Sequence, residues 1–439
     1  MALFTKQEAL DYHSKVRPGK LEVMPIKPFR DQKDLSLAYS PGVAEACMAI
    51  HANKEEVYTY TGKGNLVAVV SNGTAVLGLG NIGPEAGKPV MEGKGLLFKI
   101  FADVDVYDIN LNVTDPEKLC EVVQALEPTF GGINLEDIKA PECFYIESTL
   151  KKNMGIPVFH DDQHGTAIIS AAGMLNALEI AGKKFEDCRI VISGAGSAAI
   201  SCARLYIKMG ADPEKIAMFD SKGHINQSRS DLTEQKKEFA TKKGYASLAE
   251  AMKDADAFLG VSTAGVLNQD MVKSMSKNMP IIFACANPTP EISYNDAKEA
   301  RPDCIMGTGR SDFPNQVNNV LGFPFIFRGA LDVRARAITE GMKVAAAQSL
   351  AALAKESVPD YVLKAYNEKT LTFGPDYILP KTLDLRLIEW VSSAVAETAV
   401  NEDVAEKRIT DFTAYRKELG IRIKAARKRM DGLLAAYGV

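Results

Sequence analysis

An apolar run leads directly into two adjacent carboxylates in the segment Pro157-Val-Phe-His-Asp-Asp-Gln-His-Gly-Thr-Ala167. The run over residues 156–159 is typical of a buried strand, and a helical pattern follows over residues 168–181. Asp161 and Asp162 therefore stand where a strand ends and a helix begins, which is the usual place for chemistry in α/β proteins. Two neighbouring carboxylates there can hold a divalent cation, or divide into a metal ligand and a proton carrier.

A second pair of adjacent acids, Glu136 and Asp137, follows another apolar segment in Gly131-Gly-Ile-Asn-Leu-Glu-Asp-Ile138. A helix is predicted between the two pairs, so the strands that precede them would form a parallel βαβ unit and lie side by side. Carboxylates that meet in space repel one another unless a cation neutralises them. Because oxygen ligands favour Mg²⁺ or Mn²⁺, the sequence predicts a site for one of these ions.

Zinc is the alternative raised by His160 and His164, which have the i, i+4 spacing of helical zinc sites. That motif requires Glu directly after the first histidine, whereas this chain has Asp161 there, at a strand–helix junction. We therefore favour the carboxylate site.

A dinucleotide-binding turn is predicted in Arg189-Ile-Val-Ile-Ser-Gly-Ala-Gly-Ser-Ala-Ala-Ile200. A strand runs into the glycine-rich turn and then into a helix, and Ile216-Ala-Met-Phe-Asp220 supplies a second strand that ends in an acid. The glycines permit close approach to a pyrophosphate, and a small third residue permits close helix–strand packing. The candidate cofactor-binding residues of the turn are Gly194, Ala195, Gly196, Ser197, Ala198 and Ala199.

The residues after the second strand give two signals about the cofactor. Asp220 would hydrogen-bond the ribose hydroxyls of NAD. Ser221 and Lys222 follow at once and Arg229 lies nearby, and a hydroxyl with a cation could hold the 2′-phosphate of NADP instead. We favour NADP and leave NAD open.

Glycines 78, 80 and 83 spell a second GxGxxG. Pro84 and Gly87 argue against the long helix that a dinucleotide site requires, so we expect a packing or substrate-loop element. Lys94 stands between two glycines, and we expect it in a loop just before a strand over residues 96–101, where its ammonium could approach a ligand closely.

Length and composition describe an ordinary globular protein. The 439 residues predict two or three domains, and the net charge of −4 gives no reason to expect a nucleic-acid or membrane partner. Seven cysteines without a CxxC pair suggest neither disulfides nor a thiolate zinc site, which favours a reduced, cytoplasmic protein. Helical patterns cover residues 233–253 and, as a basic amphipathic helix, residues 409–437.

From about residue 18 to about residue 400 the chain resembles the malic enzymes, and specifically their bacterial, NADP-dependent branch. The motifs that carry the resemblance are Tyr39-Ser-Pro-Gly-Val43, Glu92-Gly-Lys-Gly95, Asn134-Leu-Glu-Asp-Ile138, His160-Asp-Asp-Gln-His-Gly-Thr-Ala167, Gly194-Ala-Gly-Ser-Ala-Ala199, Ala286-Asn-Pro-Thr289 and Gln316-Val-Asn-Asn319. The resemblance implies an α/β fold: an N-terminal substrate and metal domain (1–160), a Rossmann-like NAD(P)-binding domain (161–400) and a helical tail (401–439). It also implies a homodimer or a higher homo-oligomer.

The resemblance further implies the reaction: oxidative decarboxylation of (S)-malate to pyruvate and CO₂, with reduction of NADP or NAD and a divalent metal ion. Lys94 would be the general base, with Asp161 hydrogen-bonded to it, and Tyr39 would protonate the enol. The metal ligands would be Glu136, Asp137 and Asp162. The substrate-binding residues would be Tyr39, Lys94, Asn287 and Asn319, and the two amides would also hold the nicotinamide.

The chain departs from that family's pattern in two places. Many larger members have an Arg that binds the substrate carboxylate in the loop that here reads Asn72-Gly-Thr-Ala75. Many bacterial members carry a C-terminal domain that resembles phosphate acetyltransferase, and we expect a chain of the type without it, either naturally short or cut from a longer protein. Two other functions stay open: a metal-dependent dehydrogenase of another 2-hydroxy acid such as tartrate, weakly suggested by Thr74, and a catalytically silent metabolite-binding module.

Overall fold

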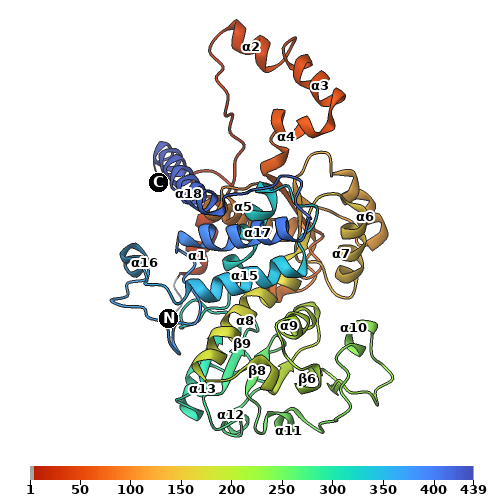
Figure 1. Cartoon of the computed structure of the whole chain (residues 1–439), viewed down its shortest axis with the longest axis vertical. Helices are drawn as coiled ribbons and strands as arrows, with labels where there is room; N and C mark the ends of the chain where they lie inside the picture. Colours follow the sequence, from red (N-terminus) through yellow and green to blue (C-terminus); the bar gives the residue numbers. More distant parts are fainter. Residues whose placement is uncertain (1–3, 439) are drawn as a thin grey trace.

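The computed structural model describes residues 4–438, and within that range it contains two β-sheets flanked by helices (Figure 1). The first sheet has the strand order β2-β1-β3-β4, and all of its strand pairs are parallel. Its strands are β1 (Leu66–Ser71), β2 (Asp105–Asn110), β3 (Gly132–Leu135) and β4 (Val158–His160). The connecting helices are α5 (Pro84–Ala102), α6 (Pro116–Ala125) and α7 (Glu142–Asn153). Parallel strands with helical crossovers bring their carboxyl ends to one edge.

The second sheet has the order β10-β9-β8-β5-β6-β7, parallel except for the last pair. Its strands are β5 (Ile190–Ser193), β6 (Ile216–Asp220), β7 (Gly223–His224), β8 (Ala257–Gly260), β9 (Ile281–Ala284) and β10 (Ile305–Thr308). The chain leaves β5 in one direction for β6 and later returns to its other side with β8. Dinucleotides bind at such a reversal of strand order, so the predicted Rossmann-like topology is confirmed.

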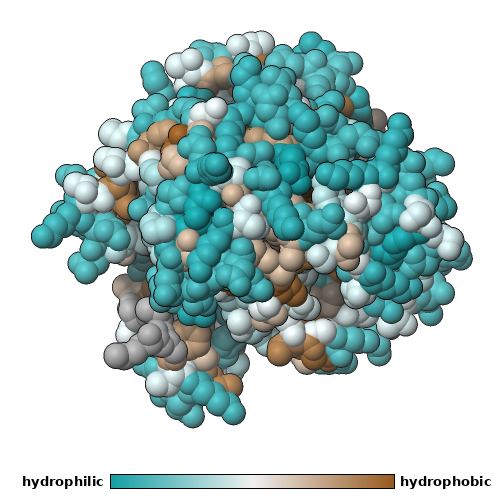
Figure 2. All heavy atoms as spheres, turned by 90° about the horizontal axis from the view of Figure 1, so that it is seen from below, coloured by the Kyte–Doolittle hydropathy of each residue, from teal (hydrophilic) through white to brown (hydrophobic). Residues whose placement is uncertain are grey.

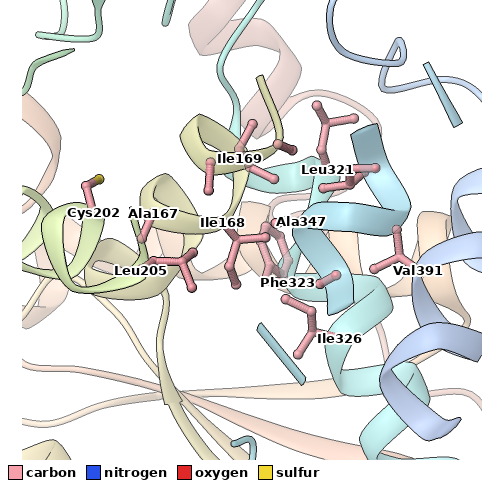
Figure 3. Packing of buried hydrophobic residues seen from close by; sticks show 14 of the residues in the cluster. Ala167, Ile168, Ile169, Cys202, Leu205, Leu321, Phe323, Ile326, Ala347 and Val391 are labelled. Atoms are coloured by element: carbon pink, nitrogen blue, oxygen red, sulfur yellow. The ribbon is translucent and has the colours of Figure 1, made fainter. Parts of the chain in front are cut away.

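Helix α8 (Asp161–Ile180) joins the two sheets and is buried along most of its length. Figure 3 shows its Ile168 and Ile169 packed among side chains of neighbouring helices, with Leu205 to one side and Phe323 to the other. Those neighbours are α9 (Ser197–Lys208), α14 (Phe323–Asp332) and α15 (Glu340–Leu353), and α17 (Ser393–Asn401) packs behind them on α14 and α15. Because α8 begins with the two acids of the predicted site, this core fixes the acids relative to both sheets.

The strand predicted over residues 96–101 is wrong, because these residues belong to helix α5. Pro84 stands in the first turn, where its missing N–H costs nothing, so it starts the helix rather than prevents it. Met91, Gly95 and Phe98 are buried three or four positions apart, which is the period of a helix face. Lys94 therefore projects from a helix and does not lie in a loop.

The single helix predicted over residues 233–253 is also wrong. The chain forms two short helices, α10 (Glu234–Lys237) and α11 (Leu248–Met252). Between them Thr241 forms a β-bridge with Asn226 and its hydroxyl donates to the carbonyl of Lys243, so the backbone follows the edge of the sheet. The predicted C-terminal helix is confirmed as α18 (Phe412–Ala436). Further short helices are α12 (Gln269–Lys273), α13 (Tyr294–Ala300) and α16 (Asp360–Ala365).

Residues 23–54 form a projecting segment, here called the N-terminal arm, that extends away from both sheets at the top of Figure 1. It carries α2 (Gln32–Ala38) and α3 (Val43–Ala52), and it lies between α1 (Lys6–Ser14) and α4 (Val57–Tyr60). Among the residues that the structure describes, none in these helices is buried. No helix within residues 4–438 has both the length and the apolar character needed to cross a membrane.

Candidate active site

Three carboxylates meet at the edge of the first sheet where β3 and β4 end. Glu136 and Asp137 follow β3, while Asp162 lies in the first turn of α8, directly after β4. The last residues of the two strands are paired in register, so the structure brings the two acid pairs together. One oxygen of each of the three carboxylates lies within 4.8 Å of the others. The backbone N–H of Asp137 donates to Asp162 Oδ2 at 2.8 Å and helps to hold this arrangement.

The electrostatics of this cluster favour a bound cation. Burial raises the pKa of Glu136 well above its usual value, and the nearby charges of Asp162 and Asp161 raise it further. A divalent cation would relieve both effects, since it favours the ionised carboxylates. The donor set consists only of carboxylate oxygens on closely spaced, mostly buried groups, so Glu136, Asp137 and Asp162 fit Mg²⁺ or Mn²⁺.

Lys94 reaches this cluster from α5. Its Nζ lies 2.7 Å from Asp161 Oδ2 and 2.9 Å from Glu136 Oε1, and 4.1 Å from the centre of the Phe323 ring. Burial alone would lower the pKa of Lys94, but the charges of Asp161 and Glu136 outweigh burial and hold the pKa above its usual range. The side chain is 10% exposed, so the ammonium is largely withdrawn from solvent.

Asn319 closes the other side of Asp161. Its amide Nδ2 donates to Asp161 Oδ2 at 3.2 Å, and its Oδ1 accepts from the hydroxyl of Thr166 at 3.2 Å. A side chain at Gly165 would lie 2.4 Å from Asp161 and 2.7 Å from Asn319, so this position has room only for glycine. Gly165 and Thr166 lie in the same sequence motif as the acids, but the sequence alone predicts no function for either.

The site lies between the two sheets, because the loop after β1 that contains Gly78 contacts the segment that follows β9 of the second sheet. A Cβ atom on Gly78 would lie 2.9 Å from the carbonyl oxygen of Asn287, which follows β9. Gly78 is the first glycine of the second GxGxxG, and its close approach to Asn287 is consistent with a packing element. Asn287 therefore lies against the loop that contains Gly78, whereas Asn319 is hydrogen-bonded to Asp161.

The predicted dinucleotide turn lies between β5 and α9. Gly194 has φ +115°, and a side chain there would meet the carbonyl of Val261 at 2.7 Å, so only glycine suits this position. Helix α9 begins at Ser197 after Gly196, which leaves backbone N–H groups pointing out of the helix N-terminus, and Ala199 is buried against the core. Of the six residues predicted from the sequence, Gly194, Ala195 and Gly196 form this turn, and Ser197, Ala198 and Ala199 form the first turn of α9.

Asp220 ends β6 and is neutralised by two cations. Arg229 donates to both of its oxygens at 2.8 and 3.0 Å, and Lys236 Nζ donates at 2.7 Å. Burial alone would raise the pKa of Asp220, but these hydrogen bonds outweigh burial and lower the pKa to about 2. Lys222 pairs with Asp231 at 2.8 Å and its side chain is 68% exposed. No sequence motif had marked Lys236, which approaches Asp220 only through the fold.

Tyr39 is the one predicted catalytic residue that the structure does not bring to Lys94. It follows α2 in the N-terminal arm and is 73% exposed. Within residues 4–438, its recorded hydrogen bonds are those of its backbone, with Leu35 and Val43. The arm that carries Tyr39 extends away from α5 and α8 (Figure 1).

His164, one of the two histidines of the zinc alternative, is engaged by other side chains. His164 Nε2 lies 2.8 Å from Glu147 Oε1, and His164 Nδ1 lies 3.2 Å from Lys343 Nζ. This pattern suits a neutral ring whose Nε2–H donates to Glu147 and whose Nδ1 accepts from Lys343. Burial lowers the pKa of His164 to about 4, the charges of Lys343 and Lys151 add to that effect, and Glu147 opposes it. With both ring nitrogens engaged, His164 is not positioned as a metal ligand.

The fold and the site together define a dinucleotide-binding α/β protein with a carboxylate centre beside its nucleotide fold. Comparison with protein families is more specific: residues 18–121 match the malic enzyme N-terminal domain, and residues 163–365 match the malic enzyme NAD binding domain. The chain belongs to the malic enzyme family.

Individual relatives agree with this assignment. An NADP-dependent malic enzyme of Haemophilus influenzae is 57% identical over 94% of this chain and 55% of its own length, and one of Halomonas elongata is 56% identical over 92% and 95%. The chain thus spans about half the length of the first relative and nearly all of the second. The crystal structure of malic enzyme from Pyrococcus horikoshii has a TM-score of 0.88 at 39% identity, covering 98% of both chains.

The carboxylate cluster generates a prediction about metal binding. Mn²⁺ should raise the unfolding temperature of the wild type, because a ligand at 100 times its Kd adds about 2.7 kcal/mol of stability. Asp137→Asn and Asp162→Asn should each weaken Mn²⁺ binding by about tenfold or more, measured by calorimetric titration, since each removes one anionic ligand. Glu117→Gln, an exposed carboxylate on α6, is the control. Equal Mn²⁺ affinity in all four proteins would contradict the site.

The neutral His164 generates a prediction about pH. Its folded pKa of about 4 lies below the unfolded value of 6.5, so the stabilisation is complete above pH 6.5 and is lost as the pH falls towards 4. The wild type should lose up to about 3 kcal/mol of unfolding free energy over that interval. His164→Asn should lose less, as measured by urea denaturation at pH 6.5 and pH 4.5. The same pH dependence in both proteins would rule out His164 as its source.

Proposed function

We propose that this chain catalyses the oxidative decarboxylation of (S)-malate to pyruvate and CO₂, with NADP⁺ as the hydride acceptor and Mg²⁺ or Mn²⁺ as the metal ion. The observation that carries the proposal is the position of Lys94 Nζ, 2.7 Å from Asp161 and 2.9 Å from the carboxylate cluster at Glu136. A proton carrier beside a cation site and a nucleotide fold is the combination that this reaction requires. The names of the relatives described above support it.

Lys94 is the proposed general base for the C2 hydroxyl of malate. A cation held by Glu136, Asp137 and Asp162 would polarise that hydroxyl and later the C2 carbonyl, and a nicotinamide on the second sheet would take the hydride. The charge of a cation bound beside Nζ would lower the pKa of Lys94 from its raised value, so that the neutral amine could accept the hydroxyl proton at Nζ. Asp161, fully buried beside it, then stabilises the ammonium that forms, and the same attraction holds the pKa of Lys94 high.

The remaining roles are the orientation of the substrate and nicotinamide by two amides and the protonation of the enol by a phenol. Asn319 keeps Asp161 pointed at Lys94 through its 3.2 Å hydrogen bond, and its amide with that of Asn287 would orient the substrate carboxylate and the nicotinamide. Tyr39 is the proposed acid that protonates C3 of the enol after CO₂ has left. The domain boundaries at residues 160 and 400, the cytoplasmic location and the homo-oligomer are further predictions that accompany this proposal.

The tartrate alternative finds less support in the structure. Thr74, the residue that suggested it, is buried, and its hydroxyl donates to Asn72 Oδ1 at 2.7 Å and accepts from the backbone N–H of Lys139 at 3.1 Å. That hydroxyl therefore closes the loop rather than pointing to a substrate. A panel of 2-hydroxy acids compared by kcat/KM separates the two substrates.

NADP is the proposed cofactor because Asp220 is already neutralised. A free carboxylate at the end of the second strand binds ribose hydroxyls and repels a 2′-phosphate. Here Arg229 and Lys236 cover both oxygens of Asp220, and Lys222 stands exposed two residues further on. Arg229, Lys236 and Lys222 face two carboxylates, Asp220 and Asp231, so the cluster keeps one positive charge in excess, which suits a phosphate.

Lys94→Ala should reduce kcat/KM for malate by about 10²–10⁴-fold, because it removes the proposed proton acceptor. The measurement is NADPH absorbance and pyruvate formation with Mn²⁺ present. Lys88→Ala, which removes an exposed lysine of the same helix, is the matched control and should keep most of the activity. Absence of turnover by the wild type with either cofactor would overturn the proposed function, and full activity of Lys94→Ala would overturn the role of the lysine.

Arg229→Ala should reduce the ratio of kcat/KM for NADP⁺ to that for NAD⁺ by about tenfold or more, since each lost charge-assisted hydrogen bond counts about 1.5–3 kcal/mol. The variant removes a cation and also frees the carboxylate of Asp220. Lys222→Ala removes a cation alone and should reduce the ratio less. Lys215→Ala, a lysine at the opposite end of β6, should leave the ratio unchanged. An unchanged ratio in Arg229→Ala would show that this cluster does not select the cofactor.

A further inference from the structure

The candidate active site keeps an excess of negative charge even with a metal ion in place. Four carboxylates, at positions 136, 137, 161 and 162, are crowded there, and Lys94 supplies one ammonium. With one divalent cation bound, four negative charges would face three positive charges. A 2-hydroxy dicarboxylate such as malate brings two more negative charges, and like charges in a largely buried site repel one another. Binding of the substrate therefore requires a further cation close to the cluster.

Lys139 is the lysine that the chain brings next to this cluster. It follows the proposed metal ligand Asp137 by two residues, just beyond the carboxyl end of β3. The backbone N–H of Lys139 donates to Thr74 Oγ1 at 3.1 Å. The backbone N–H of Ala75 donates to the carbonyl of Asp137 at 3.0 Å, and the backbone N–H of Asp137 donates to Asp162 Oδ2 at 2.8 Å. The backbone of Lys139 is thus fixed relative to two of the metal-binding carboxylates.

The ammonium of Lys139 is held more weakly than its backbone. Its Nζ lies 3.2 Å from Glu142 Oε1, and the side chain is 49% exposed. Exposed ion pairs of this kind contribute little, so the flexible side chain can turn from Glu142 to a stronger anion. Exposure alone assigns no role to a lysine, since the face of the molecule seen in Figure 2 is mainly hydrophilic. The distinguishing feature of Lys139 is a movable charge on a backbone that is fixed beside the carboxylate cluster.

Other cations around the site are engaged more firmly. Lys151 and Lys343 both approach His164, and each also forms an ion pair with a glutamate of its own helix. Arg310 follows β10, and its guanidinium donates to both oxygens of Asp312 at 2.8 and 2.7 Å. Such a bidentate pair is stronger than a single lysine contact. Of these cations the lysine at position 139 is therefore the freest to meet a substrate, and Arg310 is the rival that an experiment must exclude.

We propose that Lys139 binds the carboxylate of the substrate that is retained in pyruvate. The inference rests on the proposed function and names a residue that recognises its substrate. The carboxylate that leaves as CO₂ loses its charge during the reaction, so a cation paired with it would oppose that loss. The retained carboxylate keeps its charge throughout, and a cation on it stabilises the bound substrate and the transition state equally. Lys139 therefore contributes affinity for the substrate rather than rate.

Steady-state kinetics with NADP⁺ and Mn²⁺ test the assignment. Lys139→Met keeps the length of the side chain and removes its charge, so it should raise KM for malate about tenfold through the loss of a charge-assisted hydrogen bond. Its kcat should stay within about twofold of the wild type, because the lost interaction is common to the ground state and the transition state. Lys139→Arg should restore most of the affinity. An unchanged KM in Lys139→Met, or a fall in kcat alone, would overturn the proposal.

Two further variants are the controls. Lys118→Ala removes an exposed lysine of α6 and should leave KM for malate unchanged. Arg310→Ala removes the rival cation and should also leave it unchanged. A rise in KM for Arg310→Ala, with no rise for Lys139→Met, would assign the carboxylate to Arg310 and remove Lys139 from substrate binding.

Binding without turnover gives a second measurement. In calorimetric titrations with Mn²⁺ and without nucleotide, Lys139→Met should bind malate about tenfold more weakly than the wild type. The same variant should bind Mn²⁺ itself at least as tightly as the wild type, because a neighbouring positive charge has been removed. A merely disturbed site would lose affinity for both ligands. Weaker binding of Mn²⁺ as well as malate would therefore show that Lys139 is only structural.

The two measurements separate this inference from the proposed function. If the wild type binds malate with Mn²⁺ but does not turn it over, and Lys139→Met binds it more weakly, the function fails and the role of Lys139 stands. If the wild type turns malate over and Lys139→Met has the same KM and the same affinity for malate, the role of Lys139 is wrong and the function stands.

Discussion

The ion pairs that Lys94 makes with Asp161 and Glu136 are the interaction on which the rest of the structure depends. Four carboxylates, at positions 136, 137, 161 and 162, are crowded at one sheet edge, and Lys94 supplies the ammonium among them. Removing one partner of a buried pair costs about 3–5 kcal/mol, because the other charge is left uncompensated. A single ammonium cannot balance this set, so the same crowding that Lys94 relieves in part also creates the affinity for a divalent cation.

The packing of three secondary-structure elements keeps those charges in place. Lys94 comes from α5, Glu136 from the end of β3, and Asp161 from the start of α8, so three elements must be held together. Helix α8 achieves this because it is buried between α9 and the C-terminal helices and cannot shift without disturbing both (Figure 3). The contact between Asp161 and Asn319 also requires glycine at position 165, since a side chain there would push these two residues apart.

Local patterns were enough to predict most of the fold and the carboxylates that meet at the candidate site. The acid pairs and the turn at residues 194–199 each combine a strand, a short motif and a helix within one continuous stretch. The errors arose where the decisive contacts are distant in sequence. Glycines and prolines disguised the helical period of α5, whose buried face is defined by packing on the first sheet. Lys236 reaches Asp220 only after the chain has passed β7, and no periodicity could show that.

The sequence predicts Tyr39 as a residue of the site, whereas in the structure of the single chain Tyr39 is exposed on the N-terminal arm, away from Lys94. This difference has a physical origin. In the proposed reaction Lys94 must work in a largely buried, preorganised site, because the proton it takes is stabilised by Asp161. The enol is protonated only after CO₂ has left, so its acid need not belong to the same rigid core. The arm that carries Tyr39 is anchored at both ends, but none of the described residues of its two helices is buried, so the packing that fixes Asp161 does not fix the position of Tyr39.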